Sequence, residues 1–187
     1  MRSFLLTRLI FCGIVMFSPF TDQLVQAQQS FYDFTVEDVY GQEFDLAQLQ
    51  GKKVLVVNTA SECALTPQYE GLERLYRTYG GEDFIILAFP SNDFGNREPG
   101  SNSEIAVFCS ETYNLSFPLM AKIKIKGEEM HPLYRWLTLA SENGVEESKV
   151  SWNFQKYMID QGGTLVGLAP PWRKPESKQI VDWITEE

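Results

Sequence analysis

The sequence is poor in the residues that build metal sites and basic surfaces. Only one of its 187 residues is a histidine, His131. A single imidazole disfavours a histidine-rich metal site, so we expect His131 to be an ordinary surface or core residue. Lys and Arg number 16 against 25 Asp and Glu, a net charge of −9. Such an acidic chain lacks the basic surface that attracts nucleic acid or anionic lipid. We therefore expect no metal, no other cofactor and no nucleic-acid partner.

Long hydrophobic runs are also missing. A membrane-spanning helix needs roughly 20 apolar residues, and the apolar run at residues 9–17, LIFCGIVMF, is much shorter. Arg2 and Arg8 precede this run, and the small-x-small sequence Val25-Gln26-Ala27 follows it. This order is typical of a secretory signal peptide. We predict a signal peptide over residues 1–27, one domain over residues 28–187, and a periplasmic or secreted location without a membrane anchor.

Cysteine is scarce, with Cys12, Cys63 and Cys109 in the whole chain. Cys12 lies in the predicted signal peptide, which leaves two cysteines in the mature protein. No C-x-x-C pattern is present, and its absence disfavours a thioredoxin-type reductant. In an exported protein the simplest role for two cysteines is one structural disulfide. The sequence up to this point leaves open whether Cys63 and Cys109 are structural or reactive.

The order of the predicted elements indicates an α/β domain. Strands are predicted at residues 31–36, 54–57 and 84–89, and the last two are continuous apolar runs typical of strands buried on both faces. A helix is predicted after Thr66-Pro67, with Thr66 as its cap, and it ends at Gly80-Gly81. Alternation of strands and helices favours a parallel pair with a right-handed crossover. Further helices and a hairpin are predicted at residues 102–112, 132–139, 157–167 and 176–185.

Cys63 lies in the loop between a buried strand and the predicted helix. Unpaired backbone N–H groups and the helix dipole favour an anion at such a position. A thiol there reacts more readily as a thiolate. The alternative is a small buried hydrophobic residue, the usual role of a free cysteine. The position after the strand favours the reactive role.

Three segments in order resemble motifs of the glutathione peroxidase family. They are NTASECALTPQYEGLERLY around Cys63, FPSNDFGNREPGSNSEIAVFC ending at Cys109, and WNFQKYMIDQGGTLV beginning at Trp152. The resemblance covers nearly all of residues 31–187. It implies a thioredoxin-like fold, with a central mixed sheet flanked by helices and an N-terminal β-hairpin. It also implies a peroxidase that reduces hydrogen peroxide or organic hydroperoxides.

The resemblance assigns roles to individual residues. Cys63 matches the family's nucleophile, and Trp152 and Asn153 match its Trp-Asn pair. An indole N–H and an amide NH2 both donate hydrogen bonds, and donors to a thiolate favour its charged form. Without the resemblance, Trp152 would be read as a core residue.

The sequence departs from the family pattern at three positions. Arg97 stands in place of the Gln before Glu-Pro-Gly, Asp93 in place of the Gln in Asn-Gln-Phe-Gly, and Ala64 in place of the Gly after the nucleophile. If Arg97 points inward, its fork of donors replaces the Gln of the catalytic site. If it points outward, it is a solvated loop residue or a partner of Asp93. Both orientations remain open at this point.

Cys109 falls where some members of the family carry a second, resolving cysteine. The resemblance then implies that Cys63 becomes a sulfenic acid, that Cys109 condenses with it to a disulfide, and that an external dithiol reduces the disulfide. Cys109 shares an apolar helix face with Ile105 and Phe108, so we expect it to be buried. A disulfide needs Cα atoms within about 7 Å, so we expect its helix to unwind in part.

The resemblance also suggests partners. Tetrameric, glutathione-using members carry a long insertion before the Trp-Asn pair, whereas residues 131–151 are short here. The short segment resembles monomeric members, so we expect a monomer reduced by a thioredoxin-like protein or by glutathione. Two alternatives remain open: a peroxide sensor that relays its oxidation to another protein, and a non-catalytic exported domain with a structural disulfide.

Overall fold

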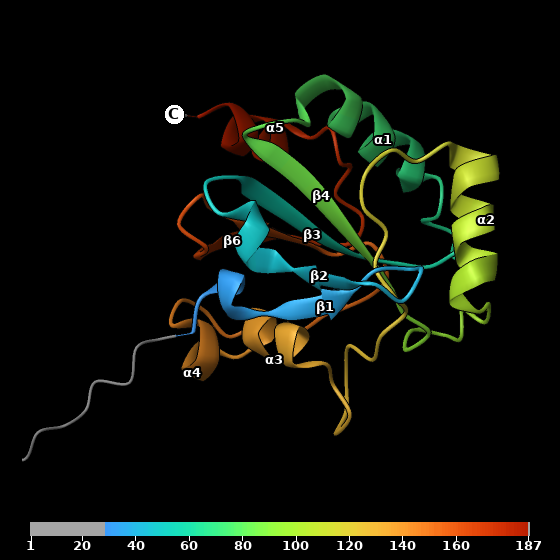
Figure 1. Ribbon diagram of the computed structural model, residues 1–187, viewed down its shortest axis with the longest axis horizontal. Helices are drawn as coiled ribbons and strands as arrows, with labels where there is room; N and C mark the ends of the chain where they lie inside the picture. The colour runs from blue at the N-terminus through green and yellow to red at the C-terminus, as the bar shows by residue number, and fades with distance from the viewer. Residues whose placement is uncertain (1–28, 187) are drawn as a thin grey trace, which may run out of the picture.

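The structure is a computed structural model, and it describes residues 29–186. The predicted signal peptide, residues 1–27, lies outside these residues. The described part folds around one central sheet with helices on both faces (Figure 1). A separate two-stranded hairpin, formed by β1 (Thr35–Glu37) and β2 (Glu43–Asp45), lies beside it.

The central sheet has four strands in the order β4-β3-β5-β6. The first two strands, β3 (Lys53–Thr59) and β4 (Phe84–Pro90), are parallel, as the intervening helix requires. The next two, β5 (Lys156–Ile159) and β6 (Leu165–Ala169), run antiparallel to their neighbours. This is the predicted mixed sheet of a thioredoxin-like fold.

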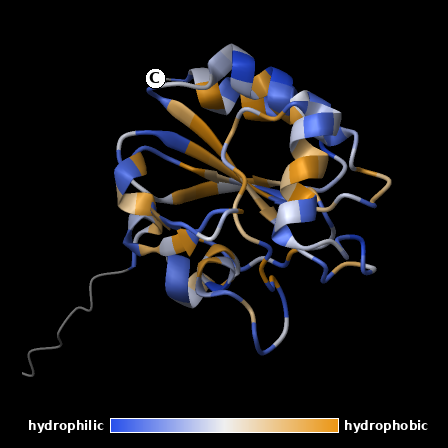
Figure 2. Ribbon diagram, turned by 45° about the vertical axis from the view of Figure 1, so that its right-hand side comes forward, coloured by the Kyte–Doolittle hydropathy of each residue, from blue (hydrophilic) through white to orange (hydrophobic). Residues whose placement is uncertain are grey.

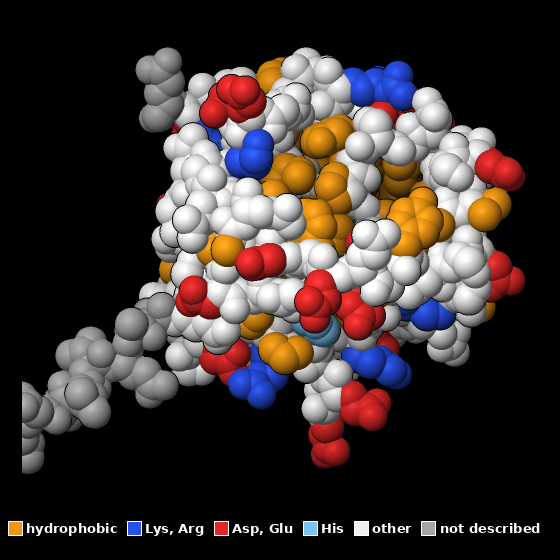
Figure 3. Space-filling view, viewed as in Figure 1, with side chains coloured by type: hydrophobic (Ala, Val, Ile, Leu, Met, Phe, Trp, Pro, Cys, Tyr) orange, Lys and Arg blue, Asp and Glu red, His pale blue; other side chains and the backbone are white. Residues whose placement is uncertain are grey.

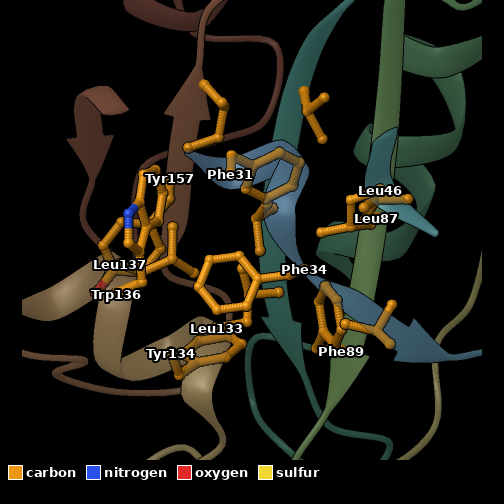
Figure 4. Packing of buried hydrophobic residues seen from close by; sticks show 14 of the residues in the cluster. Phe31, Phe34, Leu46, Leu87, Phe89, Leu133, Tyr134, Trp136, Leu137 and Tyr157 are labelled. Carbon is orange, nitrogen blue, oxygen red and sulfur yellow. The ribbon is translucent and has the colours of Figure 1, made fainter. Parts of the chain in front are cut away.

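Alternating residues of β3 supply two separate cores. Val54 and Val56 point to one face of the sheet, and Leu55 and Val57 to the other. The core on the first face is rich in aromatic rings and includes Trp136 of α3 (Pro132–Thr138) (Figure 4). Every one of these four β3 side chains is fully buried, which is why this stretch of sequence contains no polar residue.

The core on the second face lies under three helices. They are α1 (Gln68–Tyr79), α2 (Asn102–Tyr113) and α5 (Lys178–Thr185). The middle turn of α2 is hydrophobic on its outer side as well (Figure 2), where Val107 is exposed. A short helix, α4 (Ala140–Asn143), follows α3 directly. Within residues 29–186, no helix has the length and apolar character needed to cross a membrane.

The start of the domain differs from the predicted strand at residues 31–36. The chain first forms a 3₁₀ helix, η1 (Phe31–Asp33), because Ser30 and Asp33 form a capping box around it. Extended structure begins only at Thr35, in β1. A second 3₁₀ helix, η2 (Leu46–Leu49), links the hairpin to β3 and is capped by Asp45. Local side-chain bonds to the backbone therefore override the weak strand pattern.

Candidate active site

Cys63 lies in a tight turn between β3 and α1. The Thr66 hydroxyl accepts a hydrogen bond from the Cys63 N–H at 3.0 Å and donates one to the Ala60 carbonyl at 2.8 Å. The prediction that Thr66 caps the helix is therefore wrong. The first helical residue of α1 is Gln68, and its N-cap position, Pro67, offers no side-chain bond. Thr66 instead fixes the backbone on both sides of Cys63.

The sulfur of Cys63 has a backbone donor. The Leu65 N–H donates to it at 3.4 Å, within the range for a hydrogen bond to sulfur. The Cys63 side chain is half-buried and packs against the second core. A sulfur atom that is partly accessible and receives an N–H bond is suited to react as a thiolate.

The segment that holds Trp152 and Asn153 is bonded to the end of β3. The Asn58 amide donates to the Trp152 carbonyl at 3.0 Å, and the Phe154 N–H donates to the Asn58 carbonyl at 2.6 Å. Phe154 has a φ of 69°, a left-handed conformation that is uncommon for a bulky residue. Such conformations persist where surrounding structure enforces them, often at functional sites. The two hydrogen bonds to Asn58 place Trp152 and Asn153 at the same end of β3 as Cys63.

Trp152 and Asn153 have different surroundings. The Trp152 side chain is 41% exposed and packs on Phe94, with ring centroids 5.7 Å apart, so Trp152 is no core residue. Asn153 is fully buried, and its amide nitrogen donates to the Phe94 carbonyl at 3.4 Å. Its Oδ1 atom has no hydrogen-bond partner. Within residues 29–186 neither side chain donates to the Cys63 sulfur in this structure, so their direct action on the sulfur stays a prediction.

The loop after β4 joins the site through its backbone. The Glu62 N–H donates to the Arg97 carbonyl at 2.9 Å, which brings this loop beside Cys63. The Arg97 side chain is exposed, and the guanidinium nitrogen Nε lies near Gly95, where the Trp152 ring also lies. Gly95 has a φ of +68°, a conformation that glycine adopts at little cost.

Asp93 does not pair with Arg97. Its Oδ2 atom accepts hydrogen bonds from the Ile125 N–H at 2.6 Å and the Lys126 N–H at 3.2 Å. Its Oδ1 atom lies 3.6 Å from the Lys124 ammonium. Arg97 belongs to none of the ion pairs found within residues 29–186. Asp93 therefore ties the loop after β4 to the following extended segment, and the alternative that made it the partner of Arg97 is wrong.

Cys109 is buried on α2, as predicted, with 2% of its surface exposed. Both Cys63 and Cys109 are free thiols. Burial raises the pKa of the Cys109 thiol to about 11. The Tyr69 hydroxyl lowers this pKa in part, and the Glu98 carboxyl raises it further. The sequence Ser101-x-x-Glu104 predicts a capping box at the start of α2. The structure confirms it, with the Glu104 carboxylate accepting from the Ser101 N–H at 2.7 Å.

Cavities border α2 on several sides, and one of them is lined in part by Cys109. On the face shown in Figure 3, hydrophobic side chains gather between α1 and α2. A cavity of about 350 Å³ there reaches Cys109 from the side of residues 115–120. A second cavity of about 440 Å³ lies between α2 and the turn before Cys63.

Sequence reasoning missed two buried ionisable residues near the site. Burial raises the pKa of Glu98 from its ordinary value of 4.5 to about 7. Burial also lowers the pKa of Lys156 to about 7, and its ammonium nitrogen donates to Gln68 Oε1 and to the carbonyls of Pro171 and Arg173. A Glu in a polar loop and a Lys at a strand start carry no sequence signal of burial. His131 Nδ1 accepts a hydrogen bond from the Leu133 N–H at the start of α3.

Fold and site together define the class of protein. The described residues form a thioredoxin-like fold with a reactive-type cysteine after the central strand β3 and a second, buried cysteine on α2. No group of three or more His, Cys, Asp or Glu side chains within residues 29–186 is placed to hold a metal ion.

Comparison with known proteins identifies the family. Residues 31–138 match the glutathione peroxidase family. The chain is 45% identical over 148 residues to the glutathione peroxidase homolog BsaA of Staphylococcus epidermidis, covering 79% of this chain and 93% of that protein. It is 46% identical over 147 residues to the glutathione peroxidase-like peroxiredoxin gpx1 of Schizosaccharomyces pombe, covering 78% and 92%. The chain therefore belongs to the glutathione peroxidase family.

Solved structures agree with this family and fold. The crystal structure of Trgpx in apo form has a TM-score of 0.65 and 37% identity, covering 83% of this chain and 95% of that chain. A thioredoxin family thiol:disulfide interchange protein from Chlorobium tepidum, with a TM-score of 0.59 and 18% identity over 83% and 94%, shares the fold. The protein is thus a peroxidase, an oxidoreductase that uses peroxide as its acceptor.

Proposed function

We propose that this peroxidase reduces hydroperoxides through Cys63. The observation that carries the proposal is the position of its sulfur, half-buried after β3 with the Leu65 N–H as a donor. The Cys63 thiolate attacks one peroxide oxygen, an S–O bond forms and the O–O bond breaks. Cys63 becomes a sulfenic acid, and the peroxide leaves as water or an alcohol after taking up a proton.

Trp152 and Asn153 act as donors around the reacting oxygens in this proposal. Their segment is bonded to Asn58 near the end of β3, and Asn153 is buried with Oδ1 unpartnered. Small rotations of the exposed Trp152 ring bring its N–H toward a bound peroxide. The exposed Arg97 guanidinium lies on the same rim of the site, next to the Trp152 ring, and supplies positive charge to an incoming peroxide anion or acidic reductant.

Cys109 resolves the sulfenic acid in the next step. Its sulfur attacks the Cys63 sulfur, the S–S bond forms and water leaves. Cys109 is buried in the reduced protein, so α2 has to open locally before the attack. Two cavities beside α2 support this opening, because a helix with few packed neighbours opens at well below the global free energy of unfolding.

A thioredoxin-like protein or glutathione then reduces the disulfide by thiol exchange. We favour a monomer and a thioredoxin-like reductant because the segment between α4 and Trp152 is short, residues 144–151. We place the mature enzyme in the periplasm or outside the cell, on the strength of the signal-peptide pattern in residues 1–27.

Hydroperoxide turnover by the mature protein tests the proposal. Thioredoxin with its reductase and glutathione with its reductase are compared as donors, with hydrogen peroxide and an organic hydroperoxide as substrates. Cys63→Ser should lose turnover completely. Oxidation without turnover by either donor would favour the peroxide sensor, and a Cys63–Cys109 disulfide that resists both donors would favour the structural role.

A further inference from the structure

Lys156 is a buried cation that the chemistry proposed above does not use. It is the first residue of β5 and is fully buried, and within residues 29–186 no other Lys or Arg is buried. Met158, two residues further along β5, belongs to the second core, so the Lys156 side chain points to that same face of the sheet. Cys63 packs against this core as well. A buried amino group therefore lies on the face of the sheet that carries the nucleophile.

The Lys156 side chain has three oxygen partners, none of them a carboxylate. Its nitrogen donates to Gln68 Oε1 at 2.5 Å and to the carbonyls of Pro171 at 3.2 Å and Arg173 at 2.6 Å, both in the loop after β6. None of the ion pairs found within residues 29–186 includes Lys156. Burying a cation without an opposite charge is costly, and an apolar side chain of similar length would fill the same space without that cost. The three bonds therefore need a reason beyond stability.

Gln68 connects Lys156 to the turn that holds Cys63. Gln68 is the first residue of α1, and its backbone N–H donates to the Leu65 carbonyl at 2.9 Å. The N–H of the same Leu65 donates to the Cys63 sulfur at 3.4 Å. The Gln68 amide nitrogen donates to the Pro171 carbonyl at 2.7 Å, so both ends of the Gln68 amide are held. A continuous series of contacts runs from the Lys156 nitrogen through Gln68 and Leu65 to the sulfur.

The place of Lys156 in the chain links it to the other half of the site. The Trp152–Asn153 pair lies in the segment that leads directly into Lys156. Lys156 is paired with Val57 of β3, the strand that ends just before the Cys63 turn. Lys156 therefore ties the start of α1, on one side of Cys63, to the strand that follows the Trp-Asn pair.

We propose that Lys156 is a positioning residue that holds the Leu65 N–H on the Cys63 sulfur, a role that rests on the function proposed above. Lys156 acts through Gln68. With both side chains in place, the first turn of α1 is fixed relative to β5, and the Leu65 N–H stays directed at the sulfur. A donor to a thiolate favours its charged form, which is the form that attacks peroxide. Without Lys156 the turn relaxes and the sulfur loses its donor.

Hydrogen exchange of the Leu65 amide tests this role directly. Exchange in the reduced mature protein is followed residue by residue by NMR, and alkylation of Cys63 by iodoacetamide is measured with Cys109 replaced by Ser. In Lys156→Met the Leu65 amide should exchange at least tenfold faster, and Cys63 should be alkylated at least tenfold more slowly. The amide of Val56, in the middle of β3, reports global opening, so it corrects for any loss of stability.

Gln68→Met separates positioning from a general need for a buried charge. This variant leaves the Lys156 bonds to Pro171 and Arg173 and removes the connection to the turn, so it should reproduce both effects. It also carries the test if Lys156→Met does not fold. Because the two residues act through one series of contacts, the double variant should lose no more than either single variant.

Asn143→Ala is the matched control for lost stability. It removes a buried side chain of α4 that donates to the carbonyls of Trp136 and Glu146, and it should lower stability without changing either measurement at Cys63. Wild-type exchange and alkylation in the Lys156 variant would overturn the inference. So would an effect that the Gln68 variant does not share, because Lys156 would then act without Gln68. Absence of sulfenic acid on wild-type Cys63 after hydrogen peroxide would instead overturn the proposed function.

Discussion

Replacing Thr66 with Val should both destabilise the protein and disturb Cys63. Val has nearly the shape of Thr but no hydroxyl, so the change removes two hydrogen bonds without leaving a cavity. The Ala60 residue is fully buried, and its carbonyl loses the donor at 2.8 Å. An unsatisfied buried acceptor costs roughly 1–3 kcal/mol, and the lost bond to the Cys63 N–H adds about 1 kcal/mol. We expect the free energy of unfolding to fall by roughly 2–4 kcal/mol.

The consequence for catalysis follows from the same two bonds. They hold the backbone on both sides of Cys63, so their loss displaces the sulfur from the Leu65 N–H. A loss of about 1.4 kcal/mol in transition-state stabilisation is a tenfold fall in rate. We expect kcat/KM for hydrogen peroxide to drop at least tenfold, and alkylation of Cys63 by iodoacetamide, measured with Cys109 replaced by Ser, to slow.

Two control variants make the Thr66 result decisive. Thr66→Ser retains the hydroxyl and should recover most of the stability and activity. Thr78→Val removes an exposed hydroxyl on α1, bonded to the Arg74 carbonyl at 2.8 Å, and should change stability by less than about 0.5 kcal/mol. Stability is measured by urea unfolding. If Thr66→Val and Thr78→Val behave alike in both assays, the role of Thr66 in positioning Cys63 is wrong.

Three further predictions concern the residues around the sulfur. The pKa of Glu98 in the folded protein, about 7, exceeds its ordinary value of 4.5, so the free energy of unfolding should fall by about 3 kcal/mol as the pH rises from 4.5 through 7. Urea unfolding of Glu98→Gln should lack that part of the pH dependence. Cys109→Ser should accumulate sulfinic acid on Cys63 in repeated turnover with thioredoxin, and normal steady-state turnover would contradict a resolving role. Trp152→Phe should lower kcat/KM at least tenfold while unfolding changes little, whereas Trp172→Phe, at a 71% exposed ring, should leave both unchanged.

The sequence determined the features that depend on neighbours along the chain. An apolar run predicts β3, and the loop and helix after it place Cys63 at a strand–helix junction. The Ser101 and Glu104 pair predicts the start of α2, and the residue spacing on α2 places Cys109 on its buried face. These predictions are confirmed because each rests on periodicity or on a cap within a few residues.

The tertiary structure decided what depends on contacts between distant segments. Thr66 has the sequence of a helix cap, yet its hydroxyl bonds to Ala60 and Cys63 because the turn folds back on itself. Glu98 lies in a polar loop and is nevertheless buried, because the backbone of that loop bonds to the turn at Glu62. Burial is set by whatever packs against a side chain, and here the packing segments lie far apart in sequence. The sequence alone therefore predicted that Cys63 lies at a strand–helix junction, and the tertiary structure was needed to show that Glu98 is buried.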